Sequence, residues 1–225
     1  MPSPRTSFSP RGFTLTELLV TVAIVGILSV LVVALVGRGH DAANASRCLS
    51  NLRSLQMANI MYAADHHGQY VPDFVNSSAS PVSSSSQTKW HNNRAFVTML
   101  GVNPAATASV PSALLCPLHG SYSGSNGYGY NFTGLSGGTD TPGWVRGVRQ
   151  TDIVRPAETL AFADSLDWQI NSSHADKYAG SETATTQAIA YRHDNSACIA
   201  YWDGHVARLP RSQVVGNTKL WKMLE

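Results

Sequence analysis

An apolar run near the N-terminus constrains this chain more than any other feature. From Phe13 to Val36 there are 24 residues, and Glu17 is the only charged one. As a helix, such a run spans roughly 36 Å, which is longer than the hydrocarbon core of a bilayer at about 30 Å. It also exceeds the apolar core of an ordinary secretory signal peptide, about 7–15 residues. We therefore expect one membrane-spanning helix between a short N-terminal segment and a large C-terminal region.

The charges on either side of the run predict its orientation. Arg5 and Arg11 precede it, whereas Arg38 and Asp41 nearly cancel behind it. Because positively charged flanks tend to stay in the cytoplasm, we expect a cytoplasmic N-terminus and a C-terminal region on the outer side of the inner membrane, in the periplasm.

The lone carboxylate of Glu17 needs an explanation. An ionised acidic side chain at mid-membrane costs about 2.5–3.5 kcal/mol on insertion scales, and such residues usually have a partner. In the first turn of a helix, the helix dipole favours a negative charge. Two interpretations stay open: Glu17 extends to the lipid headgroups, or it pairs with an α-amine. Cleavage between Gly12 and Phe13 would create that amine, in the same chain or a neighbouring one.

The sequence Gly12-Phe13-Thr14-Leu15-Thr16-Glu17, with Arg11 before it and the apolar run behind it, resembles the class III signal of type IV prepilins and type II secretion pseudopilins. The resemblance implies that a prepilin peptidase cuts after Gly12 and methylates Phe13. It also implies that Glu17 serves assembly by pairing with the N-terminal amine of an adjacent subunit.

The domain organisation follows from this resemblance. We expect a leader at residues 1–12 and a transmembrane and assembly half-helix at 13–36. The periplasmic head should then comprise residues 37–225, including a soluble half-helix at 37–67.

The helical pattern continues beyond the membrane segment. No proline occurs between Phe13 and Tyr70, and Gly68 followed by Pro72 predicts the end of the helix. Apolar residues recur at spacings of three and four, as on the buried face of an amphipathic helix: Cys48, Leu49, Leu52, Leu55, Tyr62 and Ala63. A second apolar strip predicts that the later turns are covered on another side too: Met57, Ile60, Met61 and Ala64.

The remaining pattern predicts an α+β head. Residues 90–101 are typical of a short helix, and extended patterns occur late in the chain, at residues 159–164, 188–192, 197–202 and 205–209. We expect these to form an antiparallel meander. The fold class is therefore α+β and pilin-like, with a long N-terminal helix packed against a small C-terminal antiparallel sheet.

Composition and missing motifs argue against several classes of function. The net charge is +2 and 13% of the residues are charged. No run of basic residues suggests binding to nucleic acid. We expect no enzyme, since neither a GxSxG elbow nor an HExxH helix occurs. Three cysteines are too few for a disulfide scaffold, so either Cys48 and Cys116 form one bridge or Cys116 is a buried thiol. Cys116 and His119 make only half of a zinc pattern.

A second resemblance involves the C-terminal part of the chain. His193 is followed after nine residues by Asp203-Gly204, and Cys116-Pro117 and Cys48-x-x-Asn51 accompany this motif. Together they resemble a group of pilin-like proteins with a C-terminal His-x-nine-Asp-Gly motif, whose role the resemblance does not define.

Two interpretations of this motif stay open. Asp203 and Gly204 set a tight turn, with a histidine capping the backbone. Alternatively, the motif belongs to a cation site, because related major pseudopilins bind Ca²⁺ in a C-terminal loop. Four aspartates would then supply the oxygen ligands for Ca²⁺: Asp164, Asp167, Asp194 and Asp203.

The expected function is structural. A pseudopilin subunit would wait in the inner membrane until an assembly platform extracts it into a short fibre with other pilin or pseudopilin subunits, through a repeated, non-closing contact. The alternative is a membrane-anchored binding module for a secreted protein, a polysaccharide or DNA that does not polymerise.

Overall fold

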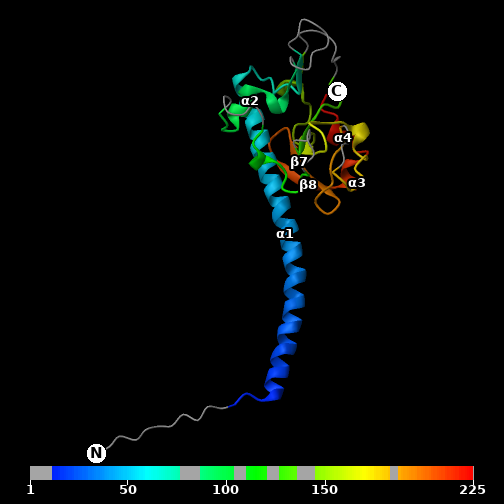
Figure 1. Cartoon of the computed structure of the whole chain (residues 1–225). Coiled ribbons are helices and arrows are strands. Elements are labelled where there is room, and N and C mark those ends of the chain that lie inside the picture. Colours follow the sequence, from blue (N-terminus) through cyan, green and yellow to red (C-terminus); the bar gives the residue numbers. More distant parts are fainter. Residues whose placement is uncertain are drawn as a thin grey trace, which may run out of the picture. The chain divides into compact units, whose positions relative to one another are not determined.

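The structure is a computed structural model (Figure 1) that describes residues 12–76, 87–103, 110–120, 127–135, 145–182 and 187–224, without the side chains of residues 33–38, 87 and 145. Of the predicted leader, residues 1–11 lie outside the described residues. The chain divides into two compact units, Met1–Ala42 and Ala43–Glu225. We describe each unit by itself and call the second the head.

One long helix, α1, runs from Leu15 to Asp65, as the sequence predicts. Its segment Leu15–Val32 is long and apolar enough to cross a membrane, and none of it is buried. The helix ends where Gly68 adopts a left-handed backbone with φ of +80°. The Gly68 N–H donates to the carbonyl of Ala63 at 2.8 Å, which satisfies one of the last helical carbonyls.

The main sheet of the head has five strands in the order β6-β3-β5-β7-β8. All neighbours are antiparallel except β3 and β6, which are parallel. The strands are β3 (Tyr128–Asn131), β5 (Leu160–Asp164), β6 (Gln169–Ile170), β7 (Ser196–Tyr201) and β8 (Val206–Pro210). Three predicted strands, those at 159–164, 197–202 and 205–209, are thereby confirmed.

Two features of the strands differ from the prediction. Residues 188–192 form no strand, because only an isolated bridge joins Ile189 to Ser165 before the chain turns at Asp194. A second, three-stranded sheet with the order β2-β1-β4 was not predicted. Its strands are two or three residues long and carry little periodicity: β1 (Phe74–Asn76), β2 (Gln87–Lys89) and β4 (Val145–Arg146).

The other helices of the head are short. The predicted helix at 90–101 is a 3-10 turn, η2 (Trp90–Asn92), followed by α2 (Arg94–Met99). The rest are η3 (Ser112–Leu114), η4 (Gln150–Asp152), η5 (Ser172–His174), α3 (Arg211–Val214) and α4 (Thr218–Trp221). Figure 1 labels α3 and α4 beside β8 in the head.

Both faces of the main sheet are covered. Side chains of a strand alternate between faces, and in β7 Cys198 and Ala200 join one core cluster, while Ala197 and Ile199 join the other. The first cluster contains α1 residues such as Leu52, and the second contains residues of α3 and α4. The expected packing of the helix on the sheet is confirmed, and the fold is α+β and pilin-like.

The second apolar strip of α1 was predicted wrongly at three of its four positions. Met57 and Met61 are 47% and 51% exposed and Ala64 is exposed too, whereas the polar residues Gln56 and Asn59 are fully buried. Gln56 donates from Nε2 to the carbonyl of Trp202 at 2.9 Å, and Asn59 donates to Gln56 Oε1 at 3.2 Å. Polar side chains are buried when hydrogen bonds satisfy them, and these partners belong to contacts that helical periodicity does not reveal.

Candidate functional site

The N-terminus of α1 carries a capping box. Glu17 Oε2 accepts hydrogen bonds from the backbone N–H of Thr14 at 2.9 Å and from its Oγ1 at 2.7 Å. In return, the Glu17 N–H donates to Thr14 Oγ1 at 3.3 Å. Sequence reasoning missed this motif, although Thr-x-x-Glu before an apolar run is its signature. In the single chain, Glu17 is therefore a cap for its own helix.

The predicted processing site lies just before this box. Phe13 is 76% exposed. Apart from the two chain neighbours, no described atom lies within 4 Å of the place where Gly12 would carry a Cβ atom. Both residues of the predicted cleavage site are thus exposed in the described part of the protein.

The two halves of the His-x-nine-Asp-Gly motif lie in different places. Asp203 and Gly204 form the turn between β7 and β8, where Asp203 Oδ1 accepts from the His205 N–H at 3.1 Å and lies 2.6 Å from His205 Nδ1. Gly204 has a φ of +99°, and a Cβ atom there would lie 3.3 Å from Ile60 of α1. These contacts agree with the turn interpretation of Asp203-Gly204.

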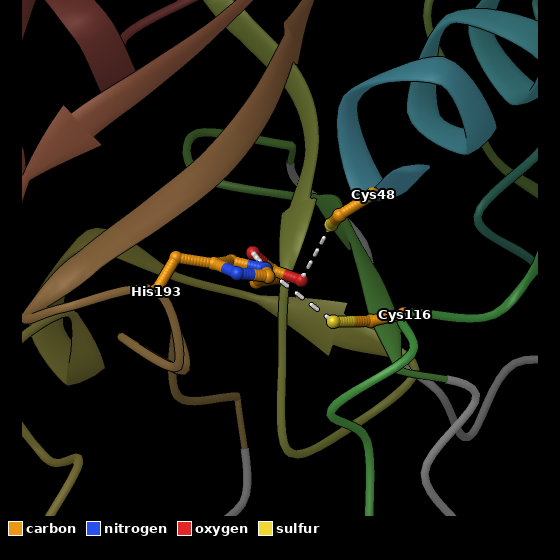
Figure 2. Close-up of side chains that lie close together, drawn as sticks. Cys48, Cys116 and His193 are labelled. Atoms are coloured by element: carbon orange, nitrogen blue, oxygen red, sulfur yellow. Dashed lines mark hydrogen bonds and ion pairs between the residues drawn. The ribbon is translucent and has the colours of Figure 1, made fainter. Parts of the chain in front are cut away.

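His193 instead joins a buried group that we call the Cys/Asp/His cluster: Cys48, Cys116, Asp164 and His193. His193 Nε2 lies 3.4 Å from Asp164 Oδ2 and 3.5 Å from Cys116 Sγ. Cys48 Sγ lies 3.2 Å from Asp164 Oδ1. Figure 2 shows the side chains of Cys48, Cys116 and His193 pointing toward one another.

Four distant segments build the cluster. Cys48 comes from α1, Cys116 from the loop after η3, and Asp164 is the last residue of β5. His193 lies in the tight turn before β7, where its N–H and carbonyl each bond Ser196 at 3.1 Å. The four potential ligand atoms all lie within 4.8 Å of one another. Among the described residues, this group of histidine, cysteine and carboxylate side chains lies close enough together to hold a metal ion.

Hydrogen-bond donors surround the cluster. The backbone N–H of Cys198 donates to Asp164 Oδ2 at 2.8 Å, and the hydroxyl of Tyr128 donates to Cys48 Sγ at 3.4 Å. Arg192 Nη1 lies 3.6 Å from Asp164 Oδ1. The same guanidinium bonds Glu182 Oε2 at 2.6 Å. The surroundings therefore suit negatively charged groups inside the cluster.

The cluster's own electrostatics define its protonation in the absence of a metal. Burial raises the pKa of Asp164, but hydrogen bonding to His193 and the charge of Arg192 outweigh it and leave that pKa below its usual value. Burial lowers the pKa of His193, but hydrogen bonds to Asp164 and Cys116 have the larger, opposite effect. The net result is a pKa raised from 6.5 to about 9. Burial raises the pKa of the Cys48 thiol. Without a metal, the cluster thus holds a carboxylate, an imidazolium and neutral thiols.

The structure rearranges the predicted sites rather than preserving them. Cys48 and Cys116, which were considered as a disulfide, are free thiols here and belong to one cluster with Asp164 and His193. Asp203 and Gly204 are not part of it. Asp167 instead accepts from the backbone of Trp168 and Gln187, and the side chain of Asp194 is 93% exposed. The oxygen-rich Ca²⁺ site considered from the sequence is therefore not assembled among the described residues.

Comparison with known proteins bears on the N-terminus. Residues 9–33 match the family model of the prokaryotic N-terminal methylation motif. No curated protein and no solved structure matches the chain. The matched segment contains Gly12, Phe13 and Glu17, and it excludes the His-x-nine-Asp-Gly motif. The motif implies processing by a prepilin peptidase and assembly with other pilin subunits, and the apolar helix fits a membrane-anchored pilin-type protein. The chain therefore carries a type IV pilin-like prepilin signal.

Proposed function

We propose that this protein is a structural pseudopilin subunit of a type II secretion-like or type IV pilus-like apparatus, and that it assembles through its N-terminal helix into a short fibre. One observation carries the proposal: the methylation motif at residues 9–33 leads into an apolar helical segment, Leu15–Val32, that is exposed on all sides in the single chain. A soluble domain would bury an apolar helix of this length, and a conventional signal peptide has a shorter apolar core.

The exposed segment needs a cover. Leu15, Leu19 and Val30 are among its side chains and are 79%, 65% and 71% exposed. In the inner membrane lipid tails would cover them, and in a fibre the equivalent helices of neighbouring subunits would do so. Because each subunit offers the same surface to the next in a head-to-tail manner, the contact repeats and does not close.

The proposal includes location and partners. The head would lie in the periplasm, and a prepilin peptidase, an inner-membrane assembly platform and other pseudopilins would be the partners. The role is structural rather than catalytic. A membrane-anchored binding module remains the alternative, and it differs in one respect that can be measured, since it would stay monomeric.

Glu17 can serve both its own helix and a neighbour. Both hydrogen bonds that Thr14 donates to Glu17 go to Oε2. A carboxylate has about four acceptor positions on its two oxygens, so Oε1 can accept from the methylated amine of Phe13 in an adjacent subunit. The cap would hold the carboxylate in place for that contact.

Two substitutions separate the cap from the charge. Glu17→Gln keeps a residue that suits the capping box but removes the negative charge. Thr14→Ala removes the Oγ1 partner and keeps the charge. Both variants should be inserted and cleaved at Phe13, as intact mass and N-terminal analysis of the membrane-extracted protein would report. In a strain with the complete apparatus, cross-linking should recover multimers of Thr14→Ala and not of Glu17→Gln.

The opposite pattern would contradict the proposal. If Glu17→Gln formed multimers as the wild type does, the charge would have no role in assembly. If the wild type itself yielded no multimers in the presence of the apparatus, the binding-module alternative would be favoured. A wild-type protein that keeps Met1 in the presence of the peptidase would refute the pilin pathway altogether.

A further inference from the structure

The Cys/Asp/His cluster is not used by the proposed function. Its members are all buried, with 0% exposure for Cys48 and Asp164. Two thiols, a carboxylate and an imidazole converge there from four segments of the chain. We propose that the cluster is a structural Zn²⁺ site with Cys48, Cys116, Asp164 and His193 as its four ligands.

The spacing of the ligand atoms fits tetrahedral coordination. Zinc binds sulfur at about 2.3 Å, and nitrogen and oxygen at about 2.0–2.2 Å, so ligand atoms of a tetrahedral site lie about 3.3–3.8 Å apart. Three contacts within the cluster lie at or near this spacing: 3.2 Å from Cys48 Sγ to Asp164 Oδ1, 3.4 Å from Asp164 Oδ2 to His193 Nε2 and 3.5 Å from His193 Nε2 to Cys116 Sγ. With one carboxylate oxygen as the ligand, the four ligand atoms lie within 4.8 Å of one another, so an ion would draw the more distant of them inward.

The chemistry of the ligands selects the ion. Ca²⁺ takes six to eight oxygen ligands and Mg²⁺ takes an octahedral set of oxygens, whereas this cluster offers one carboxylate. Two thiolates, an imidazole and a carboxylate in tetrahedral spacing suit Zn²⁺. Four protein ligands also leave no open position, as in structural rather than catalytic zinc sites. The cluster therefore has the donor set of a structural zinc site.

The surrounding residues supply what a zinc site needs from its neighbours. Two thiolates and one carboxylate around Zn²⁺ carry a net charge of −1, and the guanidinium of Arg192, 3.6 Å from Asp164 Oδ1, opposes it. The Cys198 N–H and the Tyr128 hydroxyl donate to Asp164 and to Cys48 Sγ. Donors of this kind orient metal ligands and stabilise their charged forms.

Binding exchanges protons for the metal. Two cysteine thiols and one histidine imidazolium release three protons, and Zn²⁺ takes their place on the two sulfurs and on Nε2. No electron is transferred and no further reactant is required. Such exchange is the usual consequence of metal binding to protonated ligands.

The ion would connect the two main layers of the head, which are helix α1 and the five-stranded sheet. Cys48 belongs to α1, and Asp164 ends the central strand β5, so one ion would connect the helix to the sheet. Cys116 and His193 would add two loops to the same centre. Structural zinc sites contribute directly to the stability of the folded state, so the ion would hold the helix on the head.

The first experiment measures the metal itself. The full chain, without a histidine tag, is purified in detergent with a thiol reductant, incubated with ZnSO₄ and desalted. Elemental analysis should find one zinc per chain. Co²⁺ added to the zinc-free protein should produce thiolate-to-metal charge-transfer absorption and the intense visible bands of tetrahedral Co²⁺, and Zn²⁺ should abolish both.

Two variants test the assignment of ligands. Cys116→Ser should lose the cobalt spectrum and weaken zinc binding by more than about 100-fold, since changes in outer residues alone cost 10–100-fold. His205→Gln is the control. His205 lies in the turn between β7 and β8, where its Nδ1 is 2.6 Å from Asp203 Oδ1, and it is not one of the four ligands. It should keep one zinc per chain, and circular dichroism would verify that both variants fold.

Three results would overturn the proposal. A reduced wild type that binds neither Zn²⁺ nor Co²⁺ would leave the cluster as a metal-free ion-pair network. Zinc that persists in Cys116→Ser at wild-type affinity would belong to surface histidines. Finally, peptide mapping of protein isolated without reductant could recover a Cys48–Cys116 disulfide and no metal, which would identify the cluster as a redox pair.

Discussion

Replacing Phe162 with alanine should destabilise the head by about 4 kcal/mol. The Phe162 side chain is fully buried on the face of the sheet that packs against α1. Its ring contacts Trp90 and Tyr130 edge-on, with centroids 5.1 Å apart in each pair. Truncation of a buried phenylalanine costs about 3–5 kcal/mol, and two aromatic pairs worth roughly 0.5–1.5 kcal/mol each place this site in the upper half of that range.

Two further variants separate the causes. Phe162→Leu keeps most of the apolar volume and loses the ring contacts, so it should cost about 1.5 kcal/mol. Val154→Ala changes a side chain that is 47% exposed and should cost less than about 0.5 kcal/mol. The order of the three variants therefore reports packing around the ring rather than loss of hydrophobicity alone.

The assays are urea unfolding and thermal unfolding of the detergent-solubilised full chain, both followed by tryptophan fluorescence. A head of this size loses about 2–4 °C of melting temperature per kcal/mol, so Phe162→Ala should melt about 8–16 °C below the wild type. A loss under about 1 kcal/mol, or one equal to that of Val154→Ala, would refute the view that this ring joins the helix and the sheet in one core.

Two more predictions concern backbone strain and pH. Gly204→Ala should lower the melting temperature more than Gly180→Ala does. Both glycines have a positive φ, but only at Gly204 would the new Cβ contact Ile60. Equal shifts in melting temperature would contradict this prediction. Burial and the charge of Lys89 lower the pKa of His91 from 6.5 to about 4. The unfolded chain therefore takes up this proton first, and about 3 kcal/mol of stability is lost as pH falls from 6.5 to 4. Urea unfolding of His91→Gln should show a correspondingly smaller loss of stability between pH 6.5 and pH 4. A loss equal to that of the wild type would contradict the role of His91.

Much of the backbone could be predicted because its signals are local. The single long helix follows from an uninterrupted apolar run, the absence of proline and a glycine at residue 68. The strands β5, β7 and β8 follow from short β-prone segments between turn residues. The capping box at Thr14 and Glu17 was equally local, so it could have been found from the sequence and was overlooked.

The Cys/Asp/His cluster could not be predicted in the same way. The sequence separated His193 and Asp164 as candidates for a cation site from Cys48 and Cys116 as candidates for a disulfide. Cys48 and Asp164 are 116 residues apart in the chain, yet their side chains meet at 3.2 Å. Such contacts depend on how α1 and the sheet pack, and no spacing within the chain records that packing.

Three properties were determined by the sequence alone: the cleavage and methylation signal, the helix that is long and apolar enough to cross a membrane, and the α+β fold class. These depend on residues that act on their immediate neighbours. Only the tertiary structure decided that Asp203-Gly204 is a turn, that Gln56 and Asn59 are buried, and that His193 faces Asp164 and two thiols. These depend on contacts between distant segments, because burial and ligand geometry are properties of the packed chain and not of any stretch of it.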